Sequence, residues 1–236
     1  MRGVFVTGTG TGVGKTVVAA VLARTAHASG ASVAVFKPAV SGLDDHPLRA
    51  EVWDCAAELP DHAVLRLASG SAQGDDEIAP YRYGPAVSPH LAAELAGEPI
   101  DPDRLRGAAL DATEGSDLLV SEGVGGFLVP LTPDYLVRDL ARDLGMPVVI
   151  VASPGLGTIN HTLLTIEAVR NAGLEIAEVV LNPWPEQPCS LELSNLETIS
   201  RLGTVPVETL PPLDLAWPRS WPQLALSRPE RRLRAA

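Results

Sequence analysis

The sequence predicts a doubly wound, mostly parallel α/β sheet with helices on both of its faces. Two observations lead to this fold class. Short apolar runs rich in Val, Ile and Ala alternate with segments of helical length along the chain, a pattern typical of parallel sheets built from βαβ units. A glycine-rich turn also separates the first apolar run from the first helical segment. We therefore expect residues 1–236 to form one α/β domain, with a solvated basic tail at about 228–236.

The glycine-rich turn reads Gly-Thr-Gly-Thr-Gly-Val-Gly-Lys-Thr over residues 8–16. It ends as a P-loop does, and Thr9 takes the place of the usual first glycine, so that Gly8 would make the turn instead. An apolar strand is expected before it and a helix after it, and such a junction attracts phosphate through free N–H groups and the helix dipole. We expect Lys15 to reach the β- and γ-phosphates of a nucleotide and the Thr16 hydroxyl to bind Mg²⁺. The motif therefore indicates a P-loop NTPase fold.

A dinucleotide fingerprint does not fit the same glycines. The pattern G-x-G-x-x-G would need a glycine where the chain has Val13 or Lys15. That motif also requires an acid about 20 residues further on to hold a ribose, and the second apolar run ends in Lys37 instead. The glycine pattern therefore argues against NAD binding.

Composition narrows the class of protein further. The chain has 236 residues and a formal charge of −11, which argues against a general nucleic-acid binder because such a protein needs a basic face. Two cysteines, Cys55 and Cys189, make neither a disulfide framework nor a metal site. No apolar run is long enough to span a bilayer, and the first strand begins without room for a signal peptide. We expect a cytoplasmic protein that binds no nucleic acid and no membrane.

The second expected strand covers residues 32–36 and delivers Lys37 to the carboxyl end of the sheet. Pro38 ends the strand and Gly42 permits a turn. Open α/β sheets bind their ligands at this end, so Lys37 could face the same crevice as the P-loop. From its position alone, a solvent-exposed lysine at a strand end is an equal alternative.

Two regions offer carboxylates for Mg²⁺. Residues 117–123 form a short apolar strand that ends in Glu122, as in a Walker B motif, and glycines at 123, 125 and 126 let the backbone approach a ligand. Earlier in the chain, a helix expected at 49–59 carries Asp54, which could hold the ion directly or through water. Asp44 and Asp45 compete with it, and Asp54 taken alone also fits a solvated helix acid.

The remaining elements follow in the same alternating order. Residues 67–73 are expected to form a loop, and an irregular stretch at 81–90 leads to a helix. The expected helices and strands are, in order, helices at 90–95, 101–113 and 135–144, a strand at 148–152, a helix to about 172, a strand at 176–181 that ends in Asn182-Pro183, and a helix at 191–202.

Several of these motifs together resemble the dethiobiotin synthetase family, whose ATP-dependent members close the ureido ring in biotin synthesis. They fall in the family's order and cover the chain from its start to about residue 182. The matching pieces are the P-loop, Lys-Pro-Ala-Val-Ser-Gly at 37–42, Ser-Pro-His at 88–90, Glu-Gly-Val-Gly-Gly-Phe-Leu-Val-Pro-Leu at 122–131 and Gly-Leu-Gly-Thr-Ile-Asn-His-Thr at 155–162. Beyond residue 182 the match thins to Leu-Gly-Thr-Val-Pro at 202–206.

The resemblance implies a ligase that forms C–N bonds and closes a ring. CO₂, supplied with bicarbonate, adds to one amine of 7,8-diaminononanoate and gives a carbamate, which attacks the γ-phosphate of ATP to form a carbamic-phosphoric anhydride. The second amine then closes the ring and releases phosphate, leaving dethiobiotin and ADP. The resemblance also implies a Mg²⁺ cofactor and a homodimer, in which the loop carrying Asn160 helps to close the partner's substrate site.

The resemblance assigns roles to residues as well. Lys37, Lys15 and Thr11 are the expected catalytic residues, and Thr16, Asp54 and Glu122 are the expected metal ligands. The expected substrate-binding residues are Thr11, Lys37, Ser41, Gly125 and Asn160. The expected ATP-binding residues are Gly12, Val13, Gly14, Lys15, Thr16, Val17, Asp54, Glu122, Gly123, Val124, Gly125, Asn182, Pro183, Pro206, Val207 and Glu208. Two of these depart from the family pattern: Gly12 stands where many members carry an acid, and Glu208 is only the nearest candidate for a ribose-binding acid.

Three alternatives share parts of this pattern. A partitioning-type ATPase would carry a signature lysine where this chain has Thr11. An amide-forming synthetase of the cobyrinate type normally adds a glutaminase domain, for which the chain has no room. A nucleotide-dependent switch has no need for the second cation that Lys37 would provide. A requirement for a diamine and CO₂ in turnover separates these alternatives from a dethiobiotin synthetase.

Overall fold

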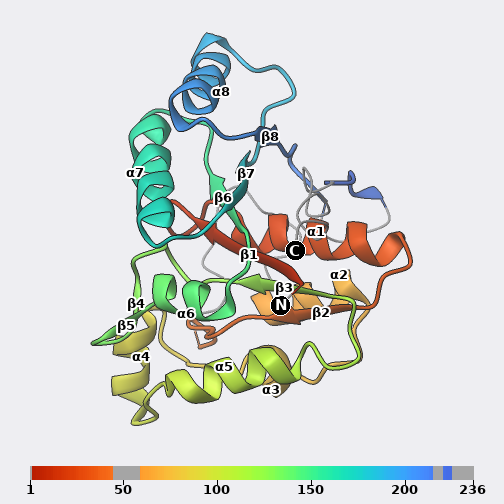
Figure 1. The fold of residues 1–236 in the computed structure, drawn as a ribbon, viewed down its shortest axis with the longest axis vertical. Helices are drawn as coiled ribbons and strands as arrows, with labels where there is room; N and C mark the ends of the chain where they lie inside the picture. The colour runs from red at the N-terminus through yellow and green to blue at the C-terminus, as the bar shows by residue number, and fades with distance from the viewer. Residues whose placement is uncertain (1, 45–58, 215–219, 225–236) are drawn as a thin grey trace, which may run out of the picture.

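The structure, a computed structural model, describes residues 2–44, 59–214 and 220–224. Its centre is a six-stranded sheet with the strand order β2-β3-β1-β6-β7-β8 (Figure 1), in which every pair of neighbouring strands is parallel. The strands are β1 (Gly3–Gly8), β2 (Val33–Phe36), β3 (Leu118–Glu122), β6 (Val148–Ala152), β7 (Ile176–Leu181) and β8 (Val207–Thr209). The predicted fold class, a doubly wound and mostly parallel α/β sheet, is confirmed.

Helices cover both faces of the sheet because side chains alternate along its buried strands. In β1, Val4 and Val6 join the apolar cluster around α1 and α2, whereas Phe5 points to the opposite face and joins the cluster around α5, α6 and α7. The helices are α1 (Lys15–Ala28), α2 (Asp61–Ser69), α3 (Asp75–Ile78), α4 (Pro89–Ala96), α5 (Pro102–Asp111), α6 (Val137–Leu144), α7 (Thr158–Asn171) and α8 (Ser190–Gly203).

The strand order places the P-loop at the middle of the sheet. From β1 the chain first runs to β2 and β3 on one side, and later to β6, β7 and β8 on the other. Strand order therefore reverses beside β1, and ligands of open α/β sheets bind in the crevice outside such a reversal. The carboxyl ends of β2, β3 and β1 are neighbours there, which brings the residues that follow these three strands together.

The region around α2 differs in part from what the sequence led us to expect. The helix expected at 49–59 lies almost entirely outside the described residues, as do Asp45 and Asp54. A helix, α2, follows it, and the expected loop at 67–73 is wrong for residues 67–69, which form the last turn of that helix. Gly70 ends α2 in the left-handed conformation, with φ 64°. A short antiparallel pair, β4 (Pro130–Thr132) and β5 (Tyr135–Leu136), also precedes α6.

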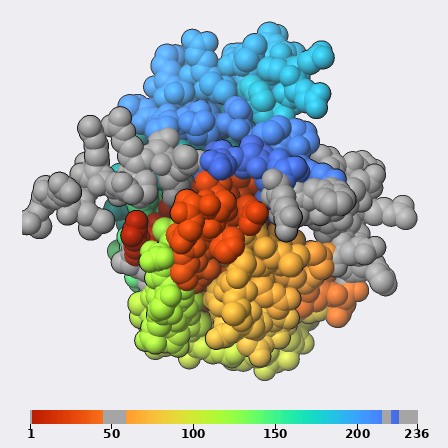
Figure 2. Space-filling model, turned by 90° about the vertical axis from the view of Figure 1, so that its right-hand side faces the viewer, coloured from red at the N-terminus to blue at the C-terminus, as the bar shows by residue number. Residues whose placement is uncertain are grey.

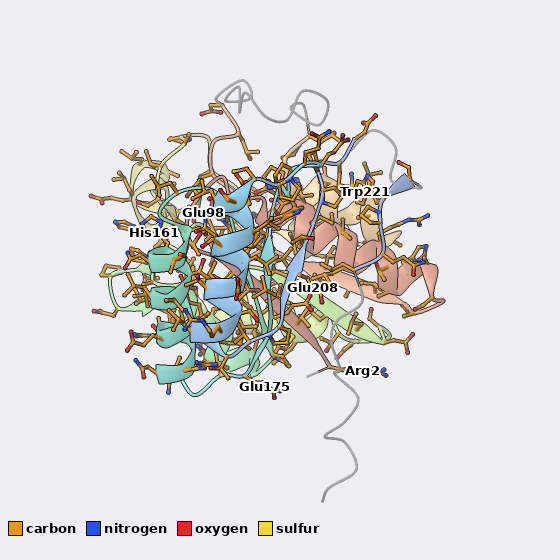
Figure 3. The ribbon with its side chains drawn as sticks, turned by 90° about the horizontal axis from the view of Figure 1, so that it is seen from above. Arg2, Glu98, His161, Glu175, Glu208 and Trp221 are labelled. Atoms are coloured by element: carbon orange, nitrogen blue, oxygen red, sulfur yellow. The ribbon has the colours of Figure 1, made fainter. Side chains whose placement is uncertain are left out.

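Helices α1 and α2 pack side by side on one face of the molecule (Figure 2). The segment after β8 returns to this face: Trp221 and Leu224 pack in the same cluster as α1, and the Leu224 amide donates to Thr25 Oγ1 at 3.2 Å. Trp221, labelled in Figure 3, lies on the flank opposite to His161 of α7. The basic tail at 228–236 lies outside the described residues. Within the described parts of the chain, each helix is too short or too polar to cross a bilayer.

Candidate nucleotide and metal site

The P-loop has the geometry of a phosphate cradle. Gly14 is the N-cap of α1 with φ 86°, and Gly12 has φ 78°, conformations that favour glycine. Neither a capping side chain nor an acid occupies the first turn of α1, so its first N–H groups are available to an anion. A side chain at Gly8 would lie 2.7 Å from Val13 Cγ2. The loop can fold back this tightly because glycine has no side chain at that position. A Cβ added at Gly12 would meet no atom of the described residues within 4 Å, so the positive φ alone favours glycine there.

Lys15 lies over this loop. Its Nζ donates to the carbonyl of Gly10 at 2.9 Å, and the side chain is buried. Burial lowers the pKa of Lys15 to about 8, although Glu122 acts in the opposite direction. A phosphate group entering the loop would restore the charged form, because an anion stabilises the ammonium ion.

Lys37, Glu122 and Asp61 form a compact charged cluster next to the P-loop. Lys37 Nζ lies 2.7 Å from Glu122 Oε1 and 2.8 Å from Asp61 Oδ2. The hydroxyl of Thr16 donates to the same Glu122 oxygen at 2.8 Å. Lys37 follows β2, Glu122 ends β3, Thr16 lies in the first turn of α1 and Asp61 begins α2. Four elements thus deliver one side chain each to the carboxyl edge of the sheet.

Burial and charge shift the pKa values of this cluster. Burial works against the charge on Lys37, but Asp61 and Glu122 together outweigh it and raise the Lys37 pKa above its ordinary value. Asp61 is only partly buried, and this partial burial opposes its charge, yet Lys37 holds the Asp61 pKa below its usual range. Burial, reinforced by Asp61, raises the pKa of Glu122 while Lys37 opposes that shift. Lys37 is therefore a fixed positive charge that balances two carboxylates.

Asp61 is the site residue that sequence reasoning missed. Its side chain remains 44% exposed, so the cluster opens to the surface on this side. The signal in the sequence is Pro60-Asp61, a proline with an acid at the start of a helix, which is a typical helix beginning. Sequence reasoning instead chose Asp54, which lies outside the described residues. Asp44, a further candidate, lies over Gly84, where a side chain would collide with its carboxylate.

The cluster fits a Mg²⁺ ion. Glu122 Oε2 is buried and has no hydrogen-bond partner among the described residues, and the Thr16 hydroxyl and Asp61 supply further oxygen atoms. Across the described ranges, no group of three or more His, Cys, Asp or Glu side chains could hold a metal. Two carboxylates and a hydroxyl suit Mg²⁺, since this ion keeps several waters and takes substrate phosphates as ligands rather than an all-protein cage.

The glycines after Glu122 bring a second loop against the P-loop. The Gly123 amide donates to the carbonyl of Val6 at 2.9 Å. A side chain added to Gly126 would lie 3.6 Å from the carbonyl oxygen of Gly8. Gly125 has φ 62°, and a side chain there would lie 2.8 Å from Val129 Cγ2. The backbone of residues 123–126, Val124 included, therefore lies against the P-loop, and its contact with a ligand stays a prediction.

Three further predicted residues, Thr11, Ser41 and Asn160, take different positions. Thr11 is exposed at the tip of the P-loop. Ser41 lies on a segment that runs beside residues 81–85, where the backbone of Val40 bridges to Arg82. Asn160 is exposed in the first turn of α7, on a different element from the charged cluster.

The predicted adenine-side residues come from the other half of the sheet. Asn182 follows β7 and is fully buried, and its Nδ2 donates to the carbonyl of Val13 at 3.2 Å. Asn182 therefore ties β7 to the P-loop, and Pro183 follows it directly. The carbonyl of Pro206 accepts from Val179 at 2.9 Å, and Val207 and Glu208 lie in the edge strand β8 (Figure 3). Residues 206–208 therefore lie beside β7 in the sheet. The side chain of Glu208 is exposed.

Comparisons with known proteins test the family resemblance found in the motifs. A family model described as an AAA domain matches residues 2–214. The chain is 42% identical over 212 residues to the ATP-dependent dethiobiotin synthetase of Anaeromyxobacter dehalogenans strain 2CP-C, covering 89% of this chain and 90% of that relative. It is 42% identical over 210 residues to the same-named protein of Rhodococcus erythropolis (88% of this chain, 87% of the relative). The corresponding protein of Bacillus subtilis strain 168 is 35% identical over 207 residues (88% and 85%). The resemblance found in the motifs is confirmed.

Proposed function

This chain belongs to the ATP-dependent dethiobiotin synthetase family, and we propose that it closes the cyclic urea of dethiobiotin from 7,8-diaminononanoate, CO₂ and ATP. It is a ligase that forms C–N bonds, and it releases ADP and phosphate. The observation that supports this reaction best is the convergence of two lysines, two carboxylates and a hydroxyl beside an anion-binding loop.

The reaction must bring two anions together, a carbamate oxygen and the γ-phosphate of ATP. Their repulsion is lowered by positive charge that is already in place before the reaction begins. Lys15 holds the β- and γ-phosphates from the P-loop. Lys37, carried on the neighbouring strand, neutralises charge where the carbamate meets the γ-phosphate. Mg²⁺, when bound, would neutralise charge on the phosphates.

Thr16, Glu122 and Asp61 are the residues that would hold this Mg²⁺. Asp61 takes the role that sequence reasoning gave to Asp54. Backbone N–H groups of residues 12–17 bind the phosphates, and the loop at 123–126 excludes water from the reacting groups. Thr11, Ser41 and Gly125 line the substrate side of the crevice.

Asn182 and Pro183 border the adenine, with Pro206, Val207 and Glu208 beyond them. A homodimer would complete the substrate site, with Asn160, exposed in the first turn of α7, reaching the crevice of the partner. We also propose that the enzyme works in the cytoplasm, where ATP and reduced thiols prevail.

The proposal is tested by measuring phosphate release from Mg·ATP, with and without 7,8-diaminononanoate and bicarbonate. Release should require both additions, and the product mass should equal the diamine plus CO₂ minus one water. Release without the diamine would instead identify a plain ATPase. ATP binding without any release would favour a nucleotide-dependent switch, and release with a different amine would favour a related amide-forming synthetase.

A further inference from the structure

The ammonium group of Lys37 occupies the place where the proposed metal ligands converge. Its Nζ lies 2.7 Å from Glu122 Oε1 and 2.8 Å from Asp61 Oδ2. The side chain is 2% exposed, so these two carboxylates are its counter-ions within the described structure. A positive charge buried to this degree needs such partners.

A divalent cation at the same carboxylates would conflict with Lys37 in two ways. Glu122 Oε1 already accepts hydrogen bonds from Lys37 and from Thr16, which leaves only Oε2 of this carboxylate without a hydrogen-bond partner among the described residues. The charges of Lys15 and Lys37 also balance those of Asp61 and Glu122, and two more positive charges beside Lys37 would be strongly repelled in a buried site. The metal and the lysine ammonium cannot both sit between the carboxylates.

Lys15 does not take part in this competition. Its Nζ donates to the carbonyl of Gly10 and makes no ion pair with either carboxylate among the described contacts. The Lys37 backbone is also fixed, since its amide donates to the carbonyl of Ile78 at 2.8 Å. With its backbone fixed, Lys37 can leave the carboxylates only by moving its side chain, and the buried ammonium group then needs another anion to receive it.

We propose that Lys37 is an internal counter-cation that excludes divalent metal from Asp61 and Glu122 until a nucleotide's phosphates accept it. Binding of metal together with a nucleoside triphosphate then moves the ammonium group from the carboxylates to the γ-phosphate. This inference rests on the proposed function for the identity of the nucleotide, but it concerns metal binding and does not need ring closure. It predicts that metal alone binds weakly and that metal and triphosphate bind with strong positive coupling.

The test compares Mn²⁺ binding by the wild type, Lys37→Met and Lys15→Met, measured from the free-ion signal in electron paramagnetic resonance. Methionine keeps the length of the side chain and removes its charge. Without nucleotide, Lys37→Met should bind Mn²⁺ roughly tenfold or more tightly than the wild type, whereas Lys15→Met should gain much less. With a non-hydrolysable ATP analogue present, the increase in Mn²⁺ affinity should be smaller in Lys37→Met than in the wild type.

Unchanged Mn²⁺ affinity in folded Lys37→Met, or an equal gain in both lysine variants, would overturn the proposal. If Lys37→Met fails to fold, lysine-selective ¹⁵N spectra of the wild type decide instead. The buried ammonium signal of Lys37 should change when Mg²⁺ and the ATP analogue are added together, and should stay unchanged with Mg²⁺ alone. A change with Mg²⁺ alone would contradict the proposal. Dethiobiotin formation is assayed separately. Absence of ring closure would therefore not alter the conclusion from metal binding, and an unexpected metal-binding result would not alter the conclusion on ring closure.

Discussion

At the scale of single residues, Lys37 should matter far more to turnover than to nucleotide binding. Its charge is needed most where the carbamate and the γ-phosphate meet, and interactions that strengthen in the transition state affect kcat. Lys37→Met should lower kcat by about 10²-fold or more. In the absence of metal, affinity for the ATP analogue, measured by calorimetry, should stay within roughly threefold of the wild type. A variant with near-normal kcat would remove Lys37 from the mechanism.

The lowered pKa of Lys15 leads us to expect that nucleotide affinity depends on pH. Burial lowers the pKa of Lys15 to about 8 in the nucleotide-free protein, and phosphate favours the protonated form, so binding above this pH takes up a proton. Affinity for ADP should therefore be steady below about pH 8 and fall as the pH rises, by roughly tenfold per pH unit.

Titration calorimetry between about pH 7 and about pH 9.5 measures this dependence. The Lys15→Arg variant provides the matched control, because a guanidinium group keeps its proton throughout this range. A flat profile in the wild type, or the same decline in Lys15→Arg, would show that Lys15 does not govern the dependence.

Asp61 is the residue of the charged cluster that could not be predicted from the local sequence. Thr16, Lys37 and Glu122 were predicted correctly as neighbours, because each directly follows a P-loop turn or a strand and parallel strands deliver such residues to one edge. Asp61 begins a helix that follows a long connection, and local sequence does not fix where such a helix packs. The short distance from Asp61 to Lys37 arises from the packing of α2 against α1 and β2.

The metal requirement distinguishes Asp61 from the other carboxylates. Asp61→Asn should raise the Mg²⁺ concentration needed for half-maximal turnover by about tenfold or more, since it removes a charged oxygen ligand. Asp44→Asn is the matched control and should change nothing, because Asp44 lies over Gly84. Asp54→Asn should have little effect. If Asp54→Asn raises the Mg²⁺ requirement and Asp61→Asn does not, the original sequence-based choice is correct.

At the scale of elements, the fold requires glycine at some positions and merely tolerates it at others. Gly125 has φ 62° and no room for a side chain beside Val129, whereas Gly107 lies inside α5 with nothing within 4 Å of an added methyl group. Gly125→Ala should lower the free energy of unfolding by roughly 1–3 kcal/mol through strain and overpacking. Gly107→Ala should raise it by roughly 0.5–1 kcal/mol.

Urea unfolding followed by circular dichroism measures both changes under the same conditions. The opposite signs are the essential outcome, since any general effect of adding a methyl group would act in one direction. Destabilisation by both substitutions would mean that α5 does not tolerate alanine at position 107 as its open surroundings indicate. A neutral Gly125→Ala would mean that the loop at 123–126 relaxes around the new side chain.

The sequence also predicted elements unevenly, for a physical reason. The strands β1, β6 and β7 are continuous apolar runs, as strands buried on both faces must be, and each appears close to its expected place. The residues before α4 lack such a pattern. There α3 is a single short turn, and Val40 reaches Arg82 only through an isolated bridge, an arrangement set by distant packing rather than by local sequence.

At the scale of the whole molecule, the proposed homodimer should depend on the flank of the molecule that carries α7. Leu156, just before α7, is 92% exposed, and Leu164 within it is also exposed. Single exposed leucines are common, but Leu164 lies on, and Leu156 directly precedes, the helix whose Asn160 is proposed to complete a partner's substrate site. The opposite flank, formed by α1 and α2, carries Leu67, which is 61% exposed and serves as a matched control.

Leu156→Asp should therefore convert the dimer to monomers at low micromolar concentration, because a carboxylate in an apolar interface loses hydration without gaining a partner. Sedimentation velocity measures the oligomeric state, and dethiobiotin formation measured on the same samples should fall with the dimer fraction. Leu67→Asp should leave both unchanged. A Leu156→Asp protein that stays dimeric would move the interface elsewhere, and a fully active monomer would mean that each chain completes its own substrate site, so that Asn160 has no role in its partner.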